Sequence, residues 1–504
     1  MGKGSGGRQQ FSSRTGFLLA AIGSAVGLGN IWRYPYIAYK YGGGSFLVPY
    51  FIAMITAGIP LLILEYTIGS KYRGSTPLAF ARLKKNCEWI GWVPTVVAGL
   101  IIFYYSAVLS WACNYFVLSF NKGWGTDTAG YFYDTFLGLS GGPLEIGGIN
   151  IPILVGLLVV WGGCWLVCSR NISSGIEKAN RFLIPFMCIA LLLIVIRGIT
   201  LPGAAVGLNA LFTPDWQAIA KPDVWMAAYG QVFFSLSIAM GIMITYSSYL
   251  PKNTELVNTS FVAGWSNSAF EFTAALGVFG ILGFKATQLG VPFEEVAKSG
   301  PGLAFVAYPE GINMIPGITG NLTGIAFFLC LMAAGFTSFI SLTEAFSAPF
   351  IEKFGVGRKK MYAITCISGF VASILIATKA GLYILDIVDY FCNNYGLLLT
   401  GILQAVACGW LLKKIPEFVE FNNRIAYIKL GKWWEICIKF ILPIMVTIVF
   451  AMSLKDFLIG GYEGYSSGAL AIFFGGPLLL TIAGAVGLTR VKWFTPVEGY
   501  ETLK

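Results

Sequence analysis

Histidine is absent from this chain of 504 residues. Its absence excludes metal sites built on imidazole, catalytic triads with a histidine base and histidine proton relays. Charged residues are scarce as well, at 12% of the chain, whereas a soluble protein carries about 25%. The ten cysteines lie mostly in apolar runs without the spacing of a zinc site, so we interpret them as small buried apolar residues. A chain that is 56% hydrophobic and this poor in charge is predicted to be an all-α polytopic membrane protein.

The apolar segments predict about twelve transmembrane helices. We place them at residues 16–39, 45–69, 90–119, 150–169, 182–199, 225–249, 256–284, 321–352, 360–378, 383–412, 433–453 and 468–489. Lys and Arg gather in alternate connections, so both termini, residues 1–15 and 490–504, are expected in the cytoplasm. The first span lacks a clear cleavage site and is interpreted as a retained helix of a plasma (inner) membrane protein. The net charge of +10 therefore indicates cytoplasmic anchoring and not a nucleic-acid partner.

The first span has an unusual centre, the run GSAVGLGNIWRYP at 23–35. Gly23, Gly27 and Gly29 are poor helix formers, and Asn30 brings an amide close to membrane depth. Irregular backbone is tolerated there only where it is buried in protein or lines a cavity. A broken helix would leave carbonyl groups for cations and N–H groups for a carboxylate. Close helix packing through Gly23 and Gly27 is the alternative.

The sixth span repeats this pattern, because QVFFSLSIAMG at 231–241 places hydroxyls and a glycine halfway along an apolar helix. Five helices precede it, so the second half of the chain would enter the membrane the other way up. Interrupted helices at matching positions of two inverted halves point to a transport site. We therefore expect a 5+5 inverted repeat, with repeats at 16–199 and 225–412, an external loop at 200–224 and two accessory helices within 413–489. The long external stretches 201–222 and 287–316 are candidate lids.

These residues resemble a known family. GSAVGLGNIWRYP at 23–35 and GGGSFLVPY at 42–50, with Tyr104, Tyr105, Asn267, Thr337 and Ser338, closely resemble the neurotransmitter:sodium symporter family. Within it the chain is most similar to bacterial amino-acid transporters with the leucine-transporter fold. The resemblance covers spans one to ten. It implies a sodium-coupled symporter that works by alternating access in the lipid bilayer and is not an enzyme.

The resemblance implies two sodium ions, which prefer hard oxygen ligands. The first ion would be bound, together with the substrate carboxylate, by Ala25, Asn30, Ser235 and Asn267. Relatives often have threonine at the position of Ser235, and serine keeps the hydroxyl. The second ion would be bound by Gly23, Val26, Ala334, Thr337 and Ser338. Taken alone, the last two hydroxyls would be expected to bond back to their own helix.

The resemblance also implies a substrate site beside the first ion. The substrate carboxylate would meet the N–H groups of Leu28 and Gly29 and the hydroxyl of Tyr105. The amine would meet carbonyls of Ala25, Phe234 and Ser235 and the hydroxyl of Ser237. The side chain would lie among Ile101, Tyr105, Phe234, Met240, Ser338 and Leu342. Because this set has no acid or base, a neutral hydrophobic amino acid is expected, with its size left open.

Ionisable residues within spans are functional candidates. Arg33 and Asp389 resemble the family's extracellular gate, and Arg8 and Glu352 resemble its intracellular gate. The intracellular set departs from the family pattern twice, since Phe11 stands where tryptophan is usual and Glu352 where aspartate is common.

Glu271 lies one helical turn beyond Asn267, on the same helix face. Chloride-dependent relatives have serine there and recruit an anion among residues that match Tyr50, Gln231, Ser235 and Asn267. A fixed carboxylate would supply the same negative charge, so Glu271 is interpreted as a chloride substitute. The alternative is a structural acid satisfied by Tyr50 and Gln231.

Other functions fit the sequence less well. A channel would need a continuous polar path or a ring of carbonyl filters. An enzyme would need a nucleophile–base pair or a metal cluster, and the sequence offers neither. A proton-coupled amino-acid carrier is the nearest alternative, but the two sets of oxygen ligands favour sodium.

Overall fold

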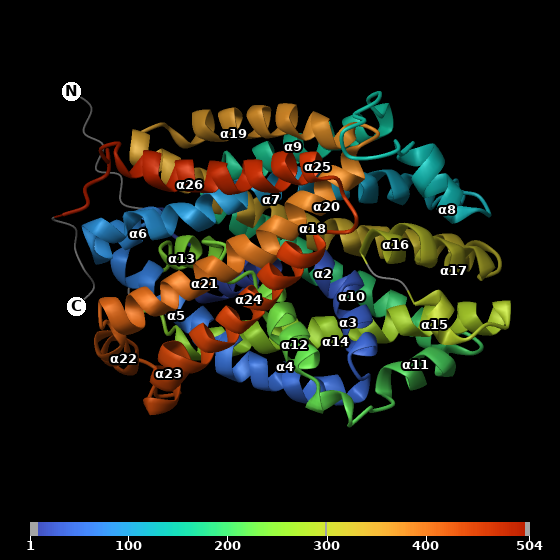
Figure 1. Cartoon of the computed structure of the whole chain (residues 1–504), viewed down its shortest axis with the longest axis horizontal. Helices are drawn as coiled ribbons and strands as arrows, with labels where there is room; N and C mark the ends of the chain where they lie inside the picture. Colours follow the sequence, from blue (N-terminus) through green and yellow to red (C-terminus); the bar gives the residue numbers. More distant parts are fainter. Residues whose placement is uncertain (1–8, 252, 298–299, 499–504) are drawn as a thin grey trace.

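The computed structural model describes residues 9–251, 253–297 and 300–498. Every named element within these ranges is a helix, which confirms the all-α fold. The long helices lie side by side and form an elongated bundle (Figure 1). Short helices of the connections lie at the two ends of this bundle, with α6 and α22 at one end and α8, α15 and α17 at the other (Figure 1).

Within the described residues, helical segments lie at each of the twelve predicted spans. In chain order they are α1 (Arg14–Ala25), α2 (Leu28–Trp32) and α3 (Tyr34–Lys40); α4 (Leu47–Ala53) and α5 (Ile59–Tyr72); α7 (Glu88–Leu118); α9 (Ile151–Cys168); α10 (Lys178–Ile199); α12 (Pro222–Ser235) and α13 (Ile242–Ser247); α14 (Val257–Leu289); α18 (Ile318–Phe354); α19 (Arg358–Ser373); α20 (Gly381–Phe391) and α21 (Leu397–Val406); α23 (Lys432–Ile436) and α24 (Leu442–Gly460); α25 (Ser467–Leu470) and α26 (Gly476–Thr489).

The connections contain α6 (Thr76–Leu83), α8 (Thr128–Gly130), α11 (Ala204–Phe212), α15 (Phe293–Val296), α16 (Gly300–Gly302), α17 (Tyr308–Met314) and α22 (Ile415–Asn423). The candidate lid at 287–316 is therefore partly helical. Two contacts hold it against the bundle. Lys285 Nζ of α14 forms an ion pair of 2.5 Å with Glu310 Oε2, and the ring of Tyr308 stacks on Phe327 of α18.

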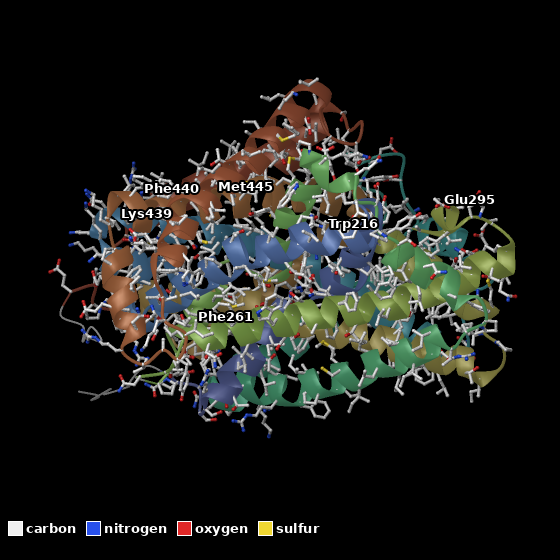
Figure 2. All side chains as sticks on the ribbon, turned by 90° about the horizontal axis from the view of Figure 1, so that it is seen from below. Trp216, Phe261, Glu295, Lys439, Phe440 and Met445 are labelled. Atoms are coloured by element: carbon white, nitrogen blue, oxygen red, sulfur yellow. The ribbon has the colours of Figure 1, made fainter. Side chains whose placement is uncertain are left out.

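The helices differ in how much of their apolar surface the protein itself covers. In the most apolar window of α7, α14 and α18, 72–78% of the residues are buried, but only 28% in the α23–α24 span and 22% in the α25–α26 span. Figure 2 shows Phe440 and Met445 along one outer edge of the bundle, and Phe440 is exposed. Apolar surface of this extent is stable when lipid covers it, so the outer helices form the boundary with the membrane.

The first span is broken where the sequence predicts it. Helices α1 and α2–α3 are bent by 55° at the break, and the backbone of Val26 between them is extended. The sequence permits this because a Cβ on Gly29 would lie 2.1 Å from the ring of Phe234, too close for any side chain. Glycine thus allows the two interrupted spans to approach each other closely.

The sixth span is broken over six residues, Leu236–Gly241, between α12 and α13. Ser237, Ala239 and Gly241 adopt left-handed backbone with φ of 51°, 62° and 74°. Such a conformation costs a non-glycine residue about 1–2 kcal/mol, so the surroundings must hold it in place. The buried carboxylate of Glu65 contributes, since its Oε1 accepts the Ala239 N–H at 3.1 Å.

Candidate functional site

A cavity of about 860 Å³ lies where the two broken helices meet. Its inner part is lined by every predicted substrate residue except Ser235, namely Ala25, Leu28, Gly29, Ile101, Tyr105, Phe234, Ser237, Met240, Ser338 and Leu342. Its outer part is lined by Arg33, Asp389 and residues of the connections, among them Pro301 and Tyr465. The cavity therefore extends from the helix breaks to the end of the bundle that carries the predicted external loops.

The opposite end of the bundle is closed. Phe11 is only 2% exposed and packs edge-on against the rings of Phe17 and Tyr246. Its backbone N–H donates to the carbonyl of Tyr249 at 3.0 Å. The segment before α1 thus covers the helix breaks on the side opposite the mouth of the cavity.

Three of the four predicted protein ligands of the first sodium ion, Asn30, Ser235 and Asn267, come together from three helices. Asn30 Nδ2 donates to Asn267 Oδ1 at 2.8 Å, and Asn267 Nδ2 donates to Ser235 Oγ at 3.1 Å. Asn30 Oδ1 accepts the N–H of Gly27 at 2.8 Å, across the break in the first span. All three polar side chains are buried. Ser235 lies in this cluster and not on the wall of the cavity.

The predicted ligands of the second ion also converge. Ser338 Oγ lies 3.1–3.4 Å from four backbone carbonyl oxygens, those of Gly23, Ser24, Val26 and Ala334. A hydroxyl carries one proton, so it satisfies only one of these acceptors fully. The excess of oxygen acceptors over protons is the chemistry that a hard cation requires. Thr337 Oγ1 donates to Ala334 O at 2.9 Å, the bond within its own helix that the sequence also allows.

The hydroxyl of Tyr105 accepts the N–H of Leu28 at 3.4 Å, so the tyrosine lies at the start of α2 as predicted. Ser237 Oγ donates to Ser24 O at 2.8 Å and thereby connects the two broken helices. Apolar side chains of the inner cavity include Ile101, Met240 and Leu342.

The predicted outer gate is present but open. Between Arg33 and Asp389, both within the described part of the chain, there is no direct ion pair. The guanidinium of Arg33 lies 4.7 Å from the ring centre of Phe234. Asp389 Oδ1 accepts hydrogen bonds from the hydroxyl of Tyr104 at 2.6 Å and from Asn393 Nδ2 at 2.8 Å. No sequence pattern predicted a role for Asn393, because its position depends on an irregular turn of the tenth span.

The predicted inner gate is only partly described. Arg8 lies outside the described residues, so the structure does not describe its predicted contact with Glu352. Glu352 accepts hydrogen bonds from the N–H of Ser75 at 3.0 Å and from its Oγ at 2.5 Å. The chain after the last span reaches the same place, since the N–H of Thr495 donates to Glu352 O at 3.0 Å.

Glu271 is fully buried behind the cluster of Asn30, Ser235 and Asn267. Its Oε1 accepts a hydrogen bond of 2.7 Å from Gln231 Nε2, and its Oε2 accepts one from the hydroxyl of Tyr50. Tyr50 also lies 2.9 Å from Ser268 Oγ, a partner that sequence reasoning missed although Ser268 follows Asn267 directly. The predicted partners of this acid are therefore in place, and both are neutral.

Another buried acid, Glu344, was not predicted. It forms an ion pair of 2.6 Å with Arg358 and accepts further hydrogen bonds from the hydroxyls of Tyr249 and Tyr362. The cluster joins α18 and α19 to the segment after α13. Nothing in the local sequence around Glu344 indicates these partners, because they meet only through tertiary packing.

Comparison with known proteins places these features in one family. A model of the sodium:neurotransmitter symporter family matches residues 8–128 and 124–494. An uncharacterized sodium-dependent transporter of Methanocaldococcus jannaschii is 39% identical over 495 residues, which are 98% of this chain and 99% of that protein. A sodium- and chloride-dependent taurine transporter of Bos taurus is 30% identical over 98% of this chain and 86% of its own length.

The fold also matches a solved structure. The crystal structure of MhsT in complex with L-phenylalanine superposes with a TM-score of 0.76 at 31% sequence identity. The match covers 89% of this chain and 100% of MhsT.

Proposed function

Because the chain belongs to the sodium:neurotransmitter symporter family, a family of transporters and not of enzymes, we propose that it couples sodium entry to uptake of a neutral hydrophobic amino acid. The observation that carries this proposal is the inner cavity. It lies at both helix breaks and is lined by Ile101, Phe234, Met240 and Leu342, without an acid or base among the inner residues. An unpaired charge in that place would be costly, which favours a neutral side chain. The L-phenylalanine bound to MhsT agrees with this choice.

Two sodium ions would travel with the substrate. Asn30, Ser235 and Asn267 would bind the first, beside the substrate carboxylate, with the carbonyl of Ala25. The carbonyl-rich cluster around Ser338 and Thr337 would bind the second, between the first and eighth spans. Since oxygens of the broken first helix belong to both sites, ion binding would fix the two halves of that helix. The substrate carboxylate would then meet the N–H groups of Leu28 and Gly29 and the Tyr105 hydroxyl.

Alternating access would follow if the two ends of the path close in turn. In the described form the outer path is open and the inner end is covered by Phe11. Closing Arg33 and Asp389 over Phe234 would occlude the substrate, and release of the segment before α1 would then open the inner side. The proposal places both termini in the cytoplasm of a plasma (inner) membrane protein. It also treats residues 16–199 and 225–412 as inverted repeats and 413–489 as accessory.

The test is uptake of tritiated L-phenylalanine into proteoliposomes of the purified protein. We expect uptake to require an inward sodium gradient, to stop when potassium replaces sodium, and to be blocked by a sodium ionophore. Competition by the other amino acids then ranks the neutral, hydrophobic ones above the charged ones. Full uptake without sodium, driven by a pH gradient, would overturn the proposal in favour of a proton-coupled carrier.

A further inference from the structure

The tenth span is irregular beside the outer gate. Between α20 and α21 the backbone forms a π-helical turn over Cys392–Gly396, in which the N–H of Leu397 donates to Cys392 O. Such single turns inside α-helices are frequent at functional sites. Asn393 belongs to this turn and, like Asp389, lines the outer part of the cavity.

Asn393 fixes the gate carboxylate. Its Nδ2 donates to Asp389 Oδ1 at 2.8 Å, and the hydroxyl of Tyr104 donates to the same oxygen at 2.6 Å. Because a carboxylate only accepts hydrogen bonds, the amide must present its nitrogen to Asp389. Two donors on Oδ1 restrain the carboxylate, while no hydrogen bond from the described residues reaches Oδ2. One oxygen of Asp389 therefore stays available for a cation.

The carbonyl oxygen at the other end of the Asn393 amide is also available for a hydrogen bond. Its Oδ1 is buried and has no hydrogen-bond partner among the described residues. Asn393, Arg33 and Phe234 line one small side pocket of about 30 Å³. The guanidinium of Arg33 lies over the ring of Phe234, a contact that leaves its N–H groups free for other acceptors. A guanidinium presents its donors as a planar fork, which suits two acceptors held side by side.

We propose that Asn393 is a third member of the outer gate: its Nδ2 holds Asp389, and its Oδ1 accepts a hydrogen bond from Arg33 when the gate closes. This inference rests on the proposed function, because it assumes that Arg33 and Asp389 close over the substrate. Closure moves the guanidinium from Phe234 to the pair formed by Asp389 Oδ2 and Asn393 Oδ1. Asn393 is thus a positioning residue, and its effect is on how long the substrate stays occluded.

The test measures dissociation of tritiated L-phenylalanine from the purified full chain in sodium, after a chase with unlabelled ligand. Asn393→Leu removes both polar ends of the amide at similar size, and we expect dissociation to be about tenfold faster, with association unchanged. Asn394→Leu is the matched control. Asn394 sits in the same π-helical turn but donates to its own helix, at Tyr390 O (3.1 Å), so dissociation should stay at the wild-type rate.

Asp389→Asn separates this inference from the gate itself. If Asp389→Asn and Asn393→Leu both release the ligand quickly, and the double variant is no faster than either, the two residues act through one gate. Fast release from Asp389→Asn with wild-type release from Asn393→Leu overturns the role of Asn393 and leaves the gate. Wild-type release from both overturns the gate. If the wild type does not bind L-phenylalanine, that ligand is rejected, and the same chase with the amino acid that passes a sodium-dependent binding screen decides between these results.

Discussion

Gln231 Nε2 donates a hydrogen bond of 2.7 Å to Oε1 of Glu271, at a site where the carboxylate is fully buried. The second oxygen is held by Tyr50, so both partners are neutral and the described Lys and Arg side chains form no ion pair with this acid. A buried charge without a partner of opposite sign is costly. In the proposed function, two sodium ions and a zwitterion would bring net positive charge into the same region, and Glu271 would offer it a fixed negative partner.

We predict that transport by the wild type does not depend on chloride. Uptake should be equal when gluconate replaces chloride at constant sodium and pH. Glu271→Ser removes the fixed charge, so this variant should have little activity in gluconate and recover part of it as chloride is added. A chloride requirement in the wild type would contradict the substitute role. So would a folded Glu271→Ser protein that ignores chloride.

We predict that Thr337→Val weakens the response to sodium. The substitution keeps the shape of the side chain but removes an oxygen next to the carbonyl cluster of Ser338. Loss of one contact to a charged partner is worth about 1.5–3 kcal/mol, so the half-saturating sodium concentration for uptake should rise about tenfold or more. Thr323→Val is the control on the same helix, because the Thr323 hydroxyl bonds only to its own helix at Thr319 O. An equal response from both variants would remove Thr337 from the ion site.

We predict that Tyr105→Phe weakens substrate binding by about 1.5–3 kcal/mol, the value of a hydrogen bond to a charged group. The change removes only the hydroxyl that lies 3.4 Å from the Leu28 N–H. Equilibrium binding of L-phenylalanine in saturating sodium measures it. Tyr308→Phe is the matched control, since the buried Tyr308 hydroxyl has no partner among the described residues. Unchanged affinity in Tyr105→Phe would mean that the carboxylate is recognised elsewhere.

We predict that Arg358→Met lowers the stability of the protein. Glu344 is fully buried, and the substitution would leave its charge without the guanidinium that it contacts at 2.6 Å. Breaking a buried ion pair from one side costs about 3–5 kcal/mol. Thermal unfolding of the purified protein should therefore occur at a clearly lower temperature. Arg424→Met, which breaks the exposed pair with Glu420, should change it little, because exposed pairs contribute about 0–1 kcal/mol.

Local features of the sequence were sufficient to predict the interrupted spans. Glycines in the first span and hydroxyls in the sixth mark places where helical backbone is weak, and the structure breaks both helices there. The predicted break in the sixth span is also where Ser237 and Ala239 adopt left-handed backbone. The convergence of Asn30, Ser235 and Asn267 was predicted only through the resemblance, because Asn30 precedes the other two by more than 200 positions.

Contacts that depend on tertiary packing were not predictable in this way. Asn393 donates to Asp389 from a π-helical turn whose position no residue pattern predicts. Ser268 and Arg358 belong to apolar or basic stretches that look ordinary, and their buried partners lie on other helices or across a loop. The placement of Ser235 behind the cavity wall, and not on it, is likewise a result of tertiary packing, which brings Asn267 of α14 within hydrogen-bond distance of Ser235.

The most direct test of the account counts sodium ions and substrate in the same experiment. Proteoliposomes are given ²²Na⁺ and tritiated L-phenylalanine together, and the initial fluxes of both are measured with and without an imposed membrane potential. We predict that each substrate molecule enters with two sodium ions, and that an inside-negative potential accelerates both fluxes. Uptake of the amino acid without accompanying ²²Na⁺, or a sodium flux that ignores the substrate, would contradict it.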